Sequence, residues 1–240
     1  MQSFETLWAS GPVFASGAGQ KPTTDSVLLA SFVNISKVHR CADLCCGAGF
    51  LSVLLAFRNP LLSVDSVEVL PEEAELCKSN MLANGFDSRS HTVCGDIRDI
   101  RTLLHAGEYD LVISNPPYFS GLDGIRSPNS TRCTARSGDG CTPGELCTAA
   151  AFLCRNGGAF ALVYRPERLS ELLCAMSASG IEPKRMRFIH SAPGTSPCLV
   201  LAEGRRNGKP GLEIAPPLFL RGCDGKETDE VREIYHMEAI

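Results

Sequence analysis

The sequence lacks any apolar run long enough to cross a membrane. A membrane-spanning helix needs roughly 20 consecutive apolar residues, and no segment of the 240-residue chain approaches that length. The start of the chain, residues 1–17, also lacks the basic stretch followed by an apolar core that marks a secretory signal. We therefore expect a protein with no membrane partner and no export signal, which works in the cytoplasm.

Cysteine pairs with metal-ligand spacing, Cys-x-x-Cys, are missing as well. The chain has 12 cysteines, but none of them form a Cys-x-x-Cys motif, and several lie in apolar runs such as 41–46. Zinc sites usually use closely spaced cysteine pairs, and disulfide-rich domains are usually small and secreted. The sequence therefore predicts buried, reduced thiols that act as small hydrophobic side chains, and no metal site.

The chain has no excess of positive charge. Its formal net charge is −4 at pH 7, so a nucleic-acid partner requires a local basic patch. Three clusters are candidates: Arg126, Arg132 and Arg136; Lys184, Arg185 and Arg187; Arg205, Arg206 and Lys209. Such clusters are usually solvated faces and do not by themselves indicate nucleic-acid binding.

What the sequence does contain is an alternation of strand-like and helix-like segments from residue 41 onward. This alternation is typical of βαβ units and predicts an α/β fold with a mostly parallel, seven-stranded sheet and helices on both faces. The predicted strands are 41–46, 61–69, 91–94, 109–114, 157–164, 187–190 and 198–203. The predicted helices begin at 50 and 71 and cover 144–154 and 166–179.

The length and the 44% hydrophobic content favour a single domain. We expect an N-terminal extension over 1–40, a core over 41–204 and a C-terminal tail over 205–240. The segment 120–143 is rich in Gly, Ser and Arg and is long for a connection, so it is predicted to be a functional lid or disordered.

The segment Asp43 to Gly49 has the pattern of a cofactor-binding turn. A predicted strand runs into a small-residue turn that opens a helix, where Gly47 and Gly49 allow a ligand to approach the backbone closely. Glu68 ends the next strand, where a carboxylate can accept hydrogen bonds from both ribose hydroxyls. A Gly-x-Gly turn alone can also serve packing only, and a dinucleotide-binding fold is the nearest alternative. Against that fold, Ser52 occupies the third small position.

A further carboxylate follows the third predicted strand. Asp96 is placed so that it can accept a hydrogen bond from the adenine amino group of a nucleoside cofactor. An aspartate that caps a turn is an equally good interpretation of this position.

The motif Asn115-Pro116-Pro117-Tyr118 indicates the chemistry most directly. An exocyclic amino or amide nitrogen is a poor nucleophile because its lone pair is delocalised. The Asn115 side-chain oxygen and the Pro116 carbonyl can accept both N–H groups and aim the lone pair at a methyl donor. Pro117 restricts the Pro116 backbone and thereby fixes that carbonyl, and Tyr118 offers a stacking face for an extruded base. The alternative is a proline-rich turn after an edge strand.

These motifs resemble class I S-adenosylmethionine-dependent methyltransferases of the Asn-Pro-Pro-Tyr group. Within that group the chain is most similar to the bacterial tRNA adenine N6-methyltransferases that modify adenine at position 37 of a valine tRNA. The resemblance implies a Rossmann-like fold, an S-adenosylmethionine cofactor and an RNA partner, tRNA. It extends over nearly the whole chain and also includes Lys21-Pro22-Thr23-Thr24-Asp25-Ser26-Val27-Leu28-Leu29, Ala135-Arg136 and Pro217-Leu218-Phe219-Leu220.

The resemblance also implies roles for individual residues. Thr24 and Asp25 are expected close to the methionine end of the cofactor, and Arg132 and Arg136 at RNA phosphates. Cys45 departs from the pattern, because such enzymes usually have the first glycine of the turn there, and Ser137-Gly138-Asp139 replaces a more helical, acidic continuation. The complete set of expected cofactor contacts is Thr24, Asp25, Asp43, Cys45, Gly47, Gly49, Glu68, Asp96 and Asn115.

Two other functions stay open at this point. A protein glutamine N5-methyltransferase uses the same four-residue motif on an amide, but its glycine turn usually follows a separate helical domain, and only 42 residues precede Asp43 here. A non-catalytic partner subunit that binds the cofactor or RNA is the other alternative. The intact motif at 115–118 argues against it.

Overall fold

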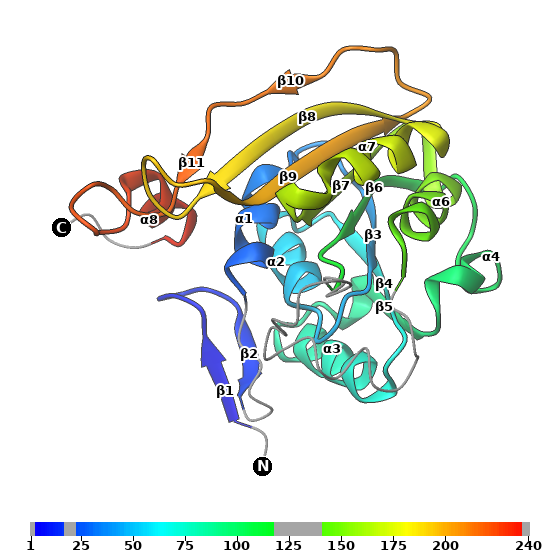
Figure 1. Cartoon of the computed structure of the whole chain (residues 1–240). Helices are drawn as coiled ribbons and strands as arrows, with labels where there is room; N and C mark the ends of the chain where they lie inside the picture. The colour runs from blue at the N-terminus through cyan, green and yellow to red at the C-terminus, as the bar shows by residue number, and fades with distance from the viewer. Residues whose placement is uncertain (1–2, 17–22, 118–140, 237–240) are drawn as a thin grey trace.

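A computed structural model describes residues 3–16, 23–117 and 141–236, and its centre is a sheet with helices on both faces (Figure 1). The strands are β1 (Ser3–Thr6), β2 (Val13–Ser16), β3 (Arg40–Leu44), β4 (Ser63–Glu68), β5 (Ser90–Cys94), β6 (Tyr109–Ser114), β7 (Cys154–Tyr164), β8 (Ile181–His190), β9 (Pro197–Arg206), β10 (Glu213–Ile214) and β11 (Leu218–Phe219). The helices are α1 (Thr24–Phe32), α2 (Phe50–Arg58), α3 (Pro71–Ala83), α4 (Ile100–Leu103), α6 (Pro143–Leu153), α7 (Leu169–Ala178) and α8 (Asp229–Ile234). Short 3-10 turns cover Asp87–Arg89, Ile97–Asp99 and Pro166–Arg168.

The sheet confirms the predicted α/β fold. Its strand order is β10-β8-β9-β7-β6-β3-β4-β5, and β11 also pairs with β8. The strands from β7 to β5 are parallel, and β9 lies antiparallel between β7 and β8. The seven predicted strands, β3 to β9, therefore form a mostly parallel sheet, which the two-residue strands β10 and β11 extend at the β8 edge.

Some element bounds differ from the predictions. The first core strand ends at Leu44, so Cys45 and Cys46 belong to the following turn. Strand β8 begins at Ile181, earlier than the predicted residue 187, because its buried residues alternate with partly exposed polar ones that hide the apolar pattern.

Two hydrophobic clusters cover the two faces of the sheet. Because successive side chains of a strand point to opposite faces, Cys41 packs with residues of α1, α2 and α3, whereas Ala42 packs with residues of α6 and α7. Likewise in β6, Leu111 belongs to the same cluster as Cys41, and Val112 belongs to the same cluster as Ala42. Burial on both faces explains why the strands appear in the sequence as continuous apolar runs.

The N-terminal hairpin β1–β2 lies outside the sheet, and the sequence pattern does not predict it. Asn80 of α3 and Asn84, the C-cap of that helix, hold it. Asn84 exchanges hydrogen bonds of 2.9 and 2.8 Å with the backbone of Val13, and Asn80 accepts one of 2.9 Å from the Ala15 N–H. Asn80 is fully buried and also donates to the Ala48 carbonyl at 2.8 Å. The hairpin is thereby tied to the turn that follows β3.

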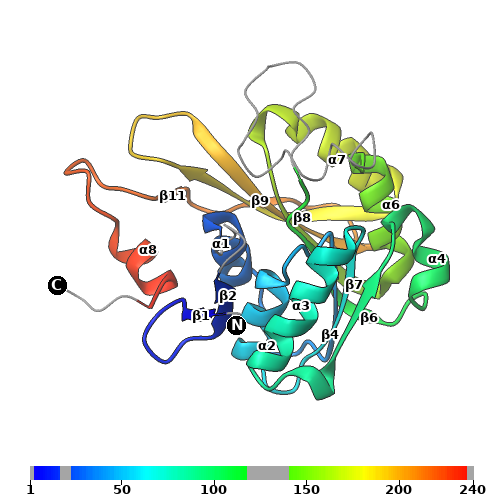
Figure 2. The same ribbon diagram turned by 90° about the horizontal axis from the view of Figure 1, so that it is seen from below.

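The C-terminal segment, which the sequence does not place, packs against β8 and α1. Strands β10 and β11 add to the sheet edge, and α8 lies beside α1 (Figure 2). Tyr235 forms a hydrogen bond with the Thr24 side chain, and the His236 ring lies 4.5 Å from the ring of Trp8 in the β1–β2 connection. Segments from both ends of the chain therefore meet around α1.

Candidate active site

The predicted site residues within the described ranges gather at one edge of the sheet. Each parallel strand from β3 to β6 ends there at a predicted site: the turn 45–49 follows β3, Glu68 is the last residue of β4, Asp96 follows β5 and Asn115 follows β6. The first turn of α1 reaches the same edge, because Asn115 forms hydrogen bonds with two of its residues. Ligands of open α/β sheets bind at the carboxyl ends of the strands, so this edge is the candidate site.

The turn after β3 uses backbone conformations that favour glycine. Gly47 has φ of 53° and Gly49 has φ of 77°, both in the left-handed region. A Cβ atom at Gly49 would collide with the Cys77 thiol of α3, whereas no atom lies within 4 Å of a Cβ at Gly47. Gly49 is therefore required for close packing, and Gly47 leaves space through which a ligand can approach the backbone.

Cys45 also adopts the left-handed conformation, with φ of 59°. This explains why glycine suits the position, since an L side chain in that conformation costs about 1–2 kcal/mol. A hydrogen bond with Cys141 and burial raise the pKa of the Cys45 thiol well above its ordinary value. Cys45 is therefore a protonated, partly buried thiol in a strained position of the turn.

Glu68 holds the turn from the neighbouring strand. Its carboxylate accepts hydrogen bonds from the Gly47 N–H at 2.8 Å and from the Leu70 N–H at 3.0 Å. The side chain is 4% exposed, and burial raises its pKa against the opposing effect of these backbone donors. Each carboxylate oxygen has a second lone pair, so the predicted contact with ribose hydroxyls is compatible with both observed bonds.

Asp43 has a buried oxygen atom to which none of the described residues forms a hydrogen bond. It is 1% exposed, and its Oδ2 accepts a hydrogen bond of 2.6 Å from the Ser52 hydroxyl, which also contacts Ser66 at 2.8 Å. Within the described part of the chain, no group bonds to Asp43 Oδ1. Burial raises the pKa of Asp43 to about 7. Because an unpaired buried acceptor costs about 1–3 kcal/mol, this oxygen fits a ligand that supplies a hydrogen-bond donor.

Asp96 has a partner of its own in this structure. Its carboxylate accepts from the Arg98 N–H at 2.9 Å and from Arg98 Nε at 3.0 Å. The hydrogen bonds from Arg98 lower the pKa of Asp96. The turn-capping interpretation is therefore realised, and the contact with an adenine amino group stays a prediction.

Asn115 connects the end of β6 with the first turn of α1. Its Nδ2 donates to Ser26 Oγ at 3.1 Å and lies 3.5 Å from Thr23 Oγ1. Thr23 is the N-cap of α1, and Pro116 behind Asn115 is buried. Thr24 and Asp25 belong to the same helical turn, so the structure brings them to the same edge of the sheet as Asn115.

Several predicted residues lie outside the described ranges. They are Tyr118, Arg132, Arg136 and residues 120–140 of the predicted lid. From residue 141 the chain is described again, and Thr142 and Glu145 form a capping box at the start of α6.

Sequence reasoning missed Ser26 as a neighbour of Asn115. The signal available for it was the spacing of two hydroxyl residues at Thr23 and Ser26, typical of a helix start. It also missed the Ser52 and Ser66 hydroxyls beside Asp43. The contacts of these hydroxyls depend on residues 9 to 89 positions away along the chain, and no sequence pattern shows them.

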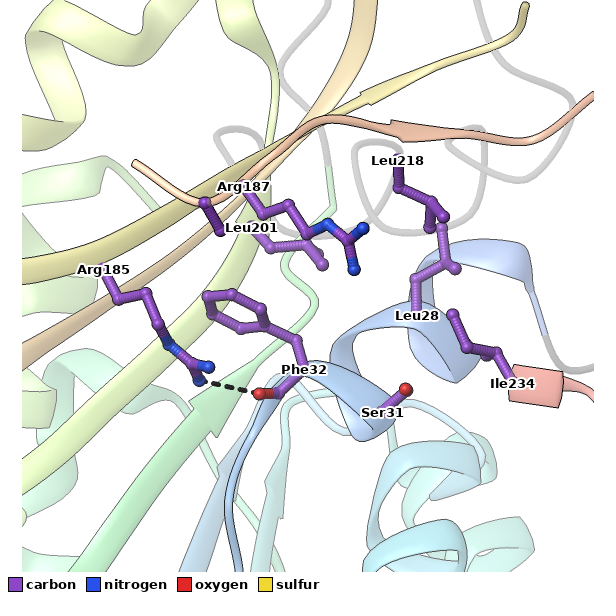
Figure 3. A pocket seen from close by; sticks show the side chains of 9 residues that line it. Leu28, Ser31, Phe32, Arg185, Arg187, Leu201, Leu218 and Ile234 are labelled. Carbon is purple, nitrogen blue, oxygen red and sulfur yellow. Dashed lines mark hydrogen bonds between the residues drawn. The ribbon is translucent and has the colours of Figure 1, made fainter. Parts of the chain in front are cut away.

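The two basic clusters within the described ranges are largely engaged in internal contacts. Arg185 donates to the Phe32 carbonyl at 2.7 Å and to Glu203 at 2.8 Å, and Arg187 forms hydrogen bonds with Glu230. Both arginines line a cavity of about 180 Å³ between α1, β8 and α8, shown in Figure 3. None of the predicted site residues lines this cavity.

Some features are absent from residues 3–16, 23–117 and 141–236. No helix there combines the length and the apolar character that crossing a membrane requires. No group of three or more His, Cys, Asp or Glu side chains is arranged to hold a metal ion in these ranges. The eleven cysteines that they contain are free thiols.

Comparison with known protein families and curated proteins finds relatives of this chain. A family model described as "Methyltransferase small domain" matches residues 6–128. The tRNA1(Val) (adenine(37)-N6)-methyltransferase of Tolumonas auensis is 31% identical over 211 residues, which cover 88% of this chain and 86% of that protein. The enzyme of the same name from Bacteroides fragilis strain YCH46 is 30% identical over 74% of this chain and 73% of its own length.

Solved structures support the same fold. A crystal structure described as a predicted O-methyltransferase from Agrobacterium tumefaciens superposes with a TM-score of 0.73 at 23% identity, over 89% of this chain and 96% of that one. A geranyl diphosphate methyltransferase in complex with S-adenosylmethionine gives a TM-score of 0.54 at 13% identity, over 75% of this chain and 84% of that one. Together these matches confirm the class I fold and the resemblance that the sequence motifs indicate.

Proposed function

Because the chain belongs to the methyltransferase small domain family, we propose that it transfers a methyl group from S-adenosylmethionine to N6 of adenine 37 in a valine tRNA. The observation that carries the proposal is Asn115-Pro116-Pro117 at the carboxyl end of β6, beside the turn that follows β3. The names of the relatives supply the substrate and the position.

The turn after β3 and the end of β4 are the parts of the chain suited to the cofactor. When bound, S-adenosylmethionine supplies an electrophilic methyl group on a sulfonium. Glu68, which holds the Gly47 N–H, would also accept hydrogen bonds from the ribose, and the open space beside Gly47 would allow the cofactor to approach the backbone. Asp43 Oδ1, which no described residue bonds to, would accept from a donor of the cofactor. Thr24 and Asp25, in the first turn of α1, would hold its methionine end.

At the end of β6, Asn115 and Pro116 orient the adenine amine. The Asn115 Oδ1 and the Pro116 carbonyl each accept one N–H of N6, so that the nitrogen lone pair points away from both. Tyr118 stacks on the extruded base. Catalysis is mostly positioning, for which effective molarities allow up to roughly 7–11 kcal/mol. The amine loses its proton to solvent after transfer, and no side chain is needed as a general base.

The tRNA contacts belong to the segment after the motif. Arg132 and Arg136 bind backbone phosphates of the tRNA, which supplies local positive charge on a chain of net charge −4. The protein acts on tRNA in the cytoplasm, as one domain with its core over 41–204. It requires no metal ion.

The test is methyl transfer from radiolabelled S-adenosylmethionine to unmodified tRNA and, separately, to total cell protein. We expect label in the tRNA pool, recovered as N6-methyladenosine after nucleoside analysis. Label recovered on protein glutamine, with none in tRNA, contradicts the proposal and supports an amide methyltransferase.

A further inference from the structure

The side-chain amide of Asn115 can adopt two orientations that have opposite chemical effects. A rotation of 180° about its last bond exchanges the acceptor Oδ1 with the donor Nδ2 and leaves the shape of the side chain almost unchanged. With Oδ1 toward the substrate, Asn115 accepts from the target amine. With Nδ2 toward the substrate, it presents N–H against N–H and repels the amine. The proposed reaction therefore requires that one orientation be selected.

Two hydroxyl groups of α1 lie beside the Nδ2 end of this amide. Ser26 Oγ is 3.1 Å and Thr23 Oγ1 is 3.5 Å from Asn115 Nδ2, and the two hydroxyl oxygens are 3.2 Å apart. Ser26 is 5% exposed, so water has little access to compete for these contacts. In the described ranges no residue donates a hydrogen bond to Asn115 Oδ1.

The capping of α1 explains why these hydroxyls accept from the amide. Thr23 Oγ1 already accepts from the Ser26 backbone N–H at 3.4 Å as the N-cap of the helix. A hydrogen bond from the Thr23 hydroxyl to Ser26 Oγ, 3.2 Å away, leaves each of the two oxygens one lone pair for Asn115 Nδ2. Because the two oxygens are only 3.2 Å apart, both face the same N–H of Nδ2, and this arrangement leaves Asn115 Oδ1 without a donor among the described residues.

We propose that Ser26 is a positioning residue, whose hydroxyl, together with Thr23, fixes the Asn115 amide with Oδ1 toward the target amine. The proposal rests on the function assigned above to Asn115. Ser26 touches neither the substrate nor the reacting atoms in this account, and acts only through Asn115. No motif of the sequence assigns it this role, because 89 residues separate it from Asn115.

The test is a double-mutant cycle on the full-length protein with S-adenosylmethionine and unmodified tRNA. Ser26→Ala removes the hydroxyl and no other group, and is expected to lower kcat about tenfold with KM for tRNA nearly unchanged. In the Asn115→Ala background the same substitution is expected to change kcat less than about twofold, because no amide is left to orient. Ser31→Ala, at an exposed position of the same helix, is the matched control and should leave kcat unchanged.

Each outcome of the cycle decides a different point. A loss in kcat from Ser26→Ala that is equally large in both backgrounds overturns the proposal, since Ser26 then acts independently of Asn115. An unchanged kcat in Ser26→Ala also overturns it. If instead Asn115→Ala alone keeps full activity, the proposed function of Asn115 fails, and not merely the role of Ser26. Thermal unfolding and S-adenosylmethionine affinity of Ser26→Ala distinguish a general loss of structure from the specific effect, because both should match the unmodified protein.

Discussion

The loop after β3 and the loop after β6 are built by different means. The first is fixed by its own backbone: Gly47 and Gly49 adopt left-handed conformations, and Glu68 on the adjacent strand accepts from Gly47. The second is fixed by side chains from a distant element, because Asn115 depends on hydroxyls at the start of α1. The turn after β3 therefore rests mainly on local backbone geometry, whereas the position of the Asn115 side chain rests on tertiary contacts.

Since Asn115 is expected to contact the reacting amine, we expect the largest loss of kcat from a substitution in the loop after β6. Asn115→Ala should lower kcat at least about a hundredfold, as loss of a contact that stabilises the transition state does. Affinity for S-adenosylmethionine, measured by calorimetry, should stay nearly unchanged because the loop after β3 is untouched. Normal turnover in this variant would remove Asn115 from the mechanism.

Within the loop after β3, the two glycines should differ in what they contribute to stability. Gly49→Ala is expected to lower the free energy of unfolding by about 2 kcal/mol, because its Cβ meets the Cys77 thiol in addition to the cost of a positive φ. Gly47→Ala should cost about 1 kcal/mol, since its Cβ enters open space. Urea unfolding measures both. Equal losses would contradict the assigned packing role of Gly49.

Glu68 is expected to act on cofactor affinity. Glu68→Gln keeps the size of the side chain but replaces one acceptor oxygen by an amide donor, so that it cannot serve both the Gly47 N–H and a ribose hydroxyl pair. The Kd for S-adenosylmethionine should rise about tenfold. Glu75→Gln, at an exposed position of α3, is the control and should bind as the unmodified protein does.

The smallest effect is expected at Cys45. Cys45→Gly relieves an L side chain at φ of 59° and should raise the free energy of unfolding by about 1 kcal/mol. Cys45→Ala removes the thiol but keeps the positive φ, so it should bring no such gain. A stabilisation of equal size in both variants would attribute the effect to the thiol and not to the backbone.

The parts of the fold that could be predicted from the sequence are those that follow from local sequence patterns. The strands β3, β4 and β6 are buried on both faces and therefore appear as apolar runs, and α3 has Pro71 at its start and Asn84-Gly85 at its end. The glycine turn and Glu68 follow from the same local order. The edge strand β8 is half-buried, and its predicted start was wrong for that reason.

The remaining elements depend on contacts between residues far apart in the sequence, which local patterns do not indicate. The hairpin β1–β2 is held by Asn80 and Asn84, which are 65 to 71 residues away along the chain. Strands β10 and β11 have two residues each and exist only because β8 offers an open edge. The contact between Ser26 and Asn115 is of the same kind.

The most direct measurement is methylation of two valine tRNA transcripts that differ only at position 37, with adenine in one and guanine in the other. We expect about one methyl group per adenine-37 transcript, recovered as N6-methyladenosine, and none in the guanine-37 transcript. Equal methylation of both transcripts would contradict the assignment of position 37, and methylation of neither would contradict the assignment of this tRNA as the substrate.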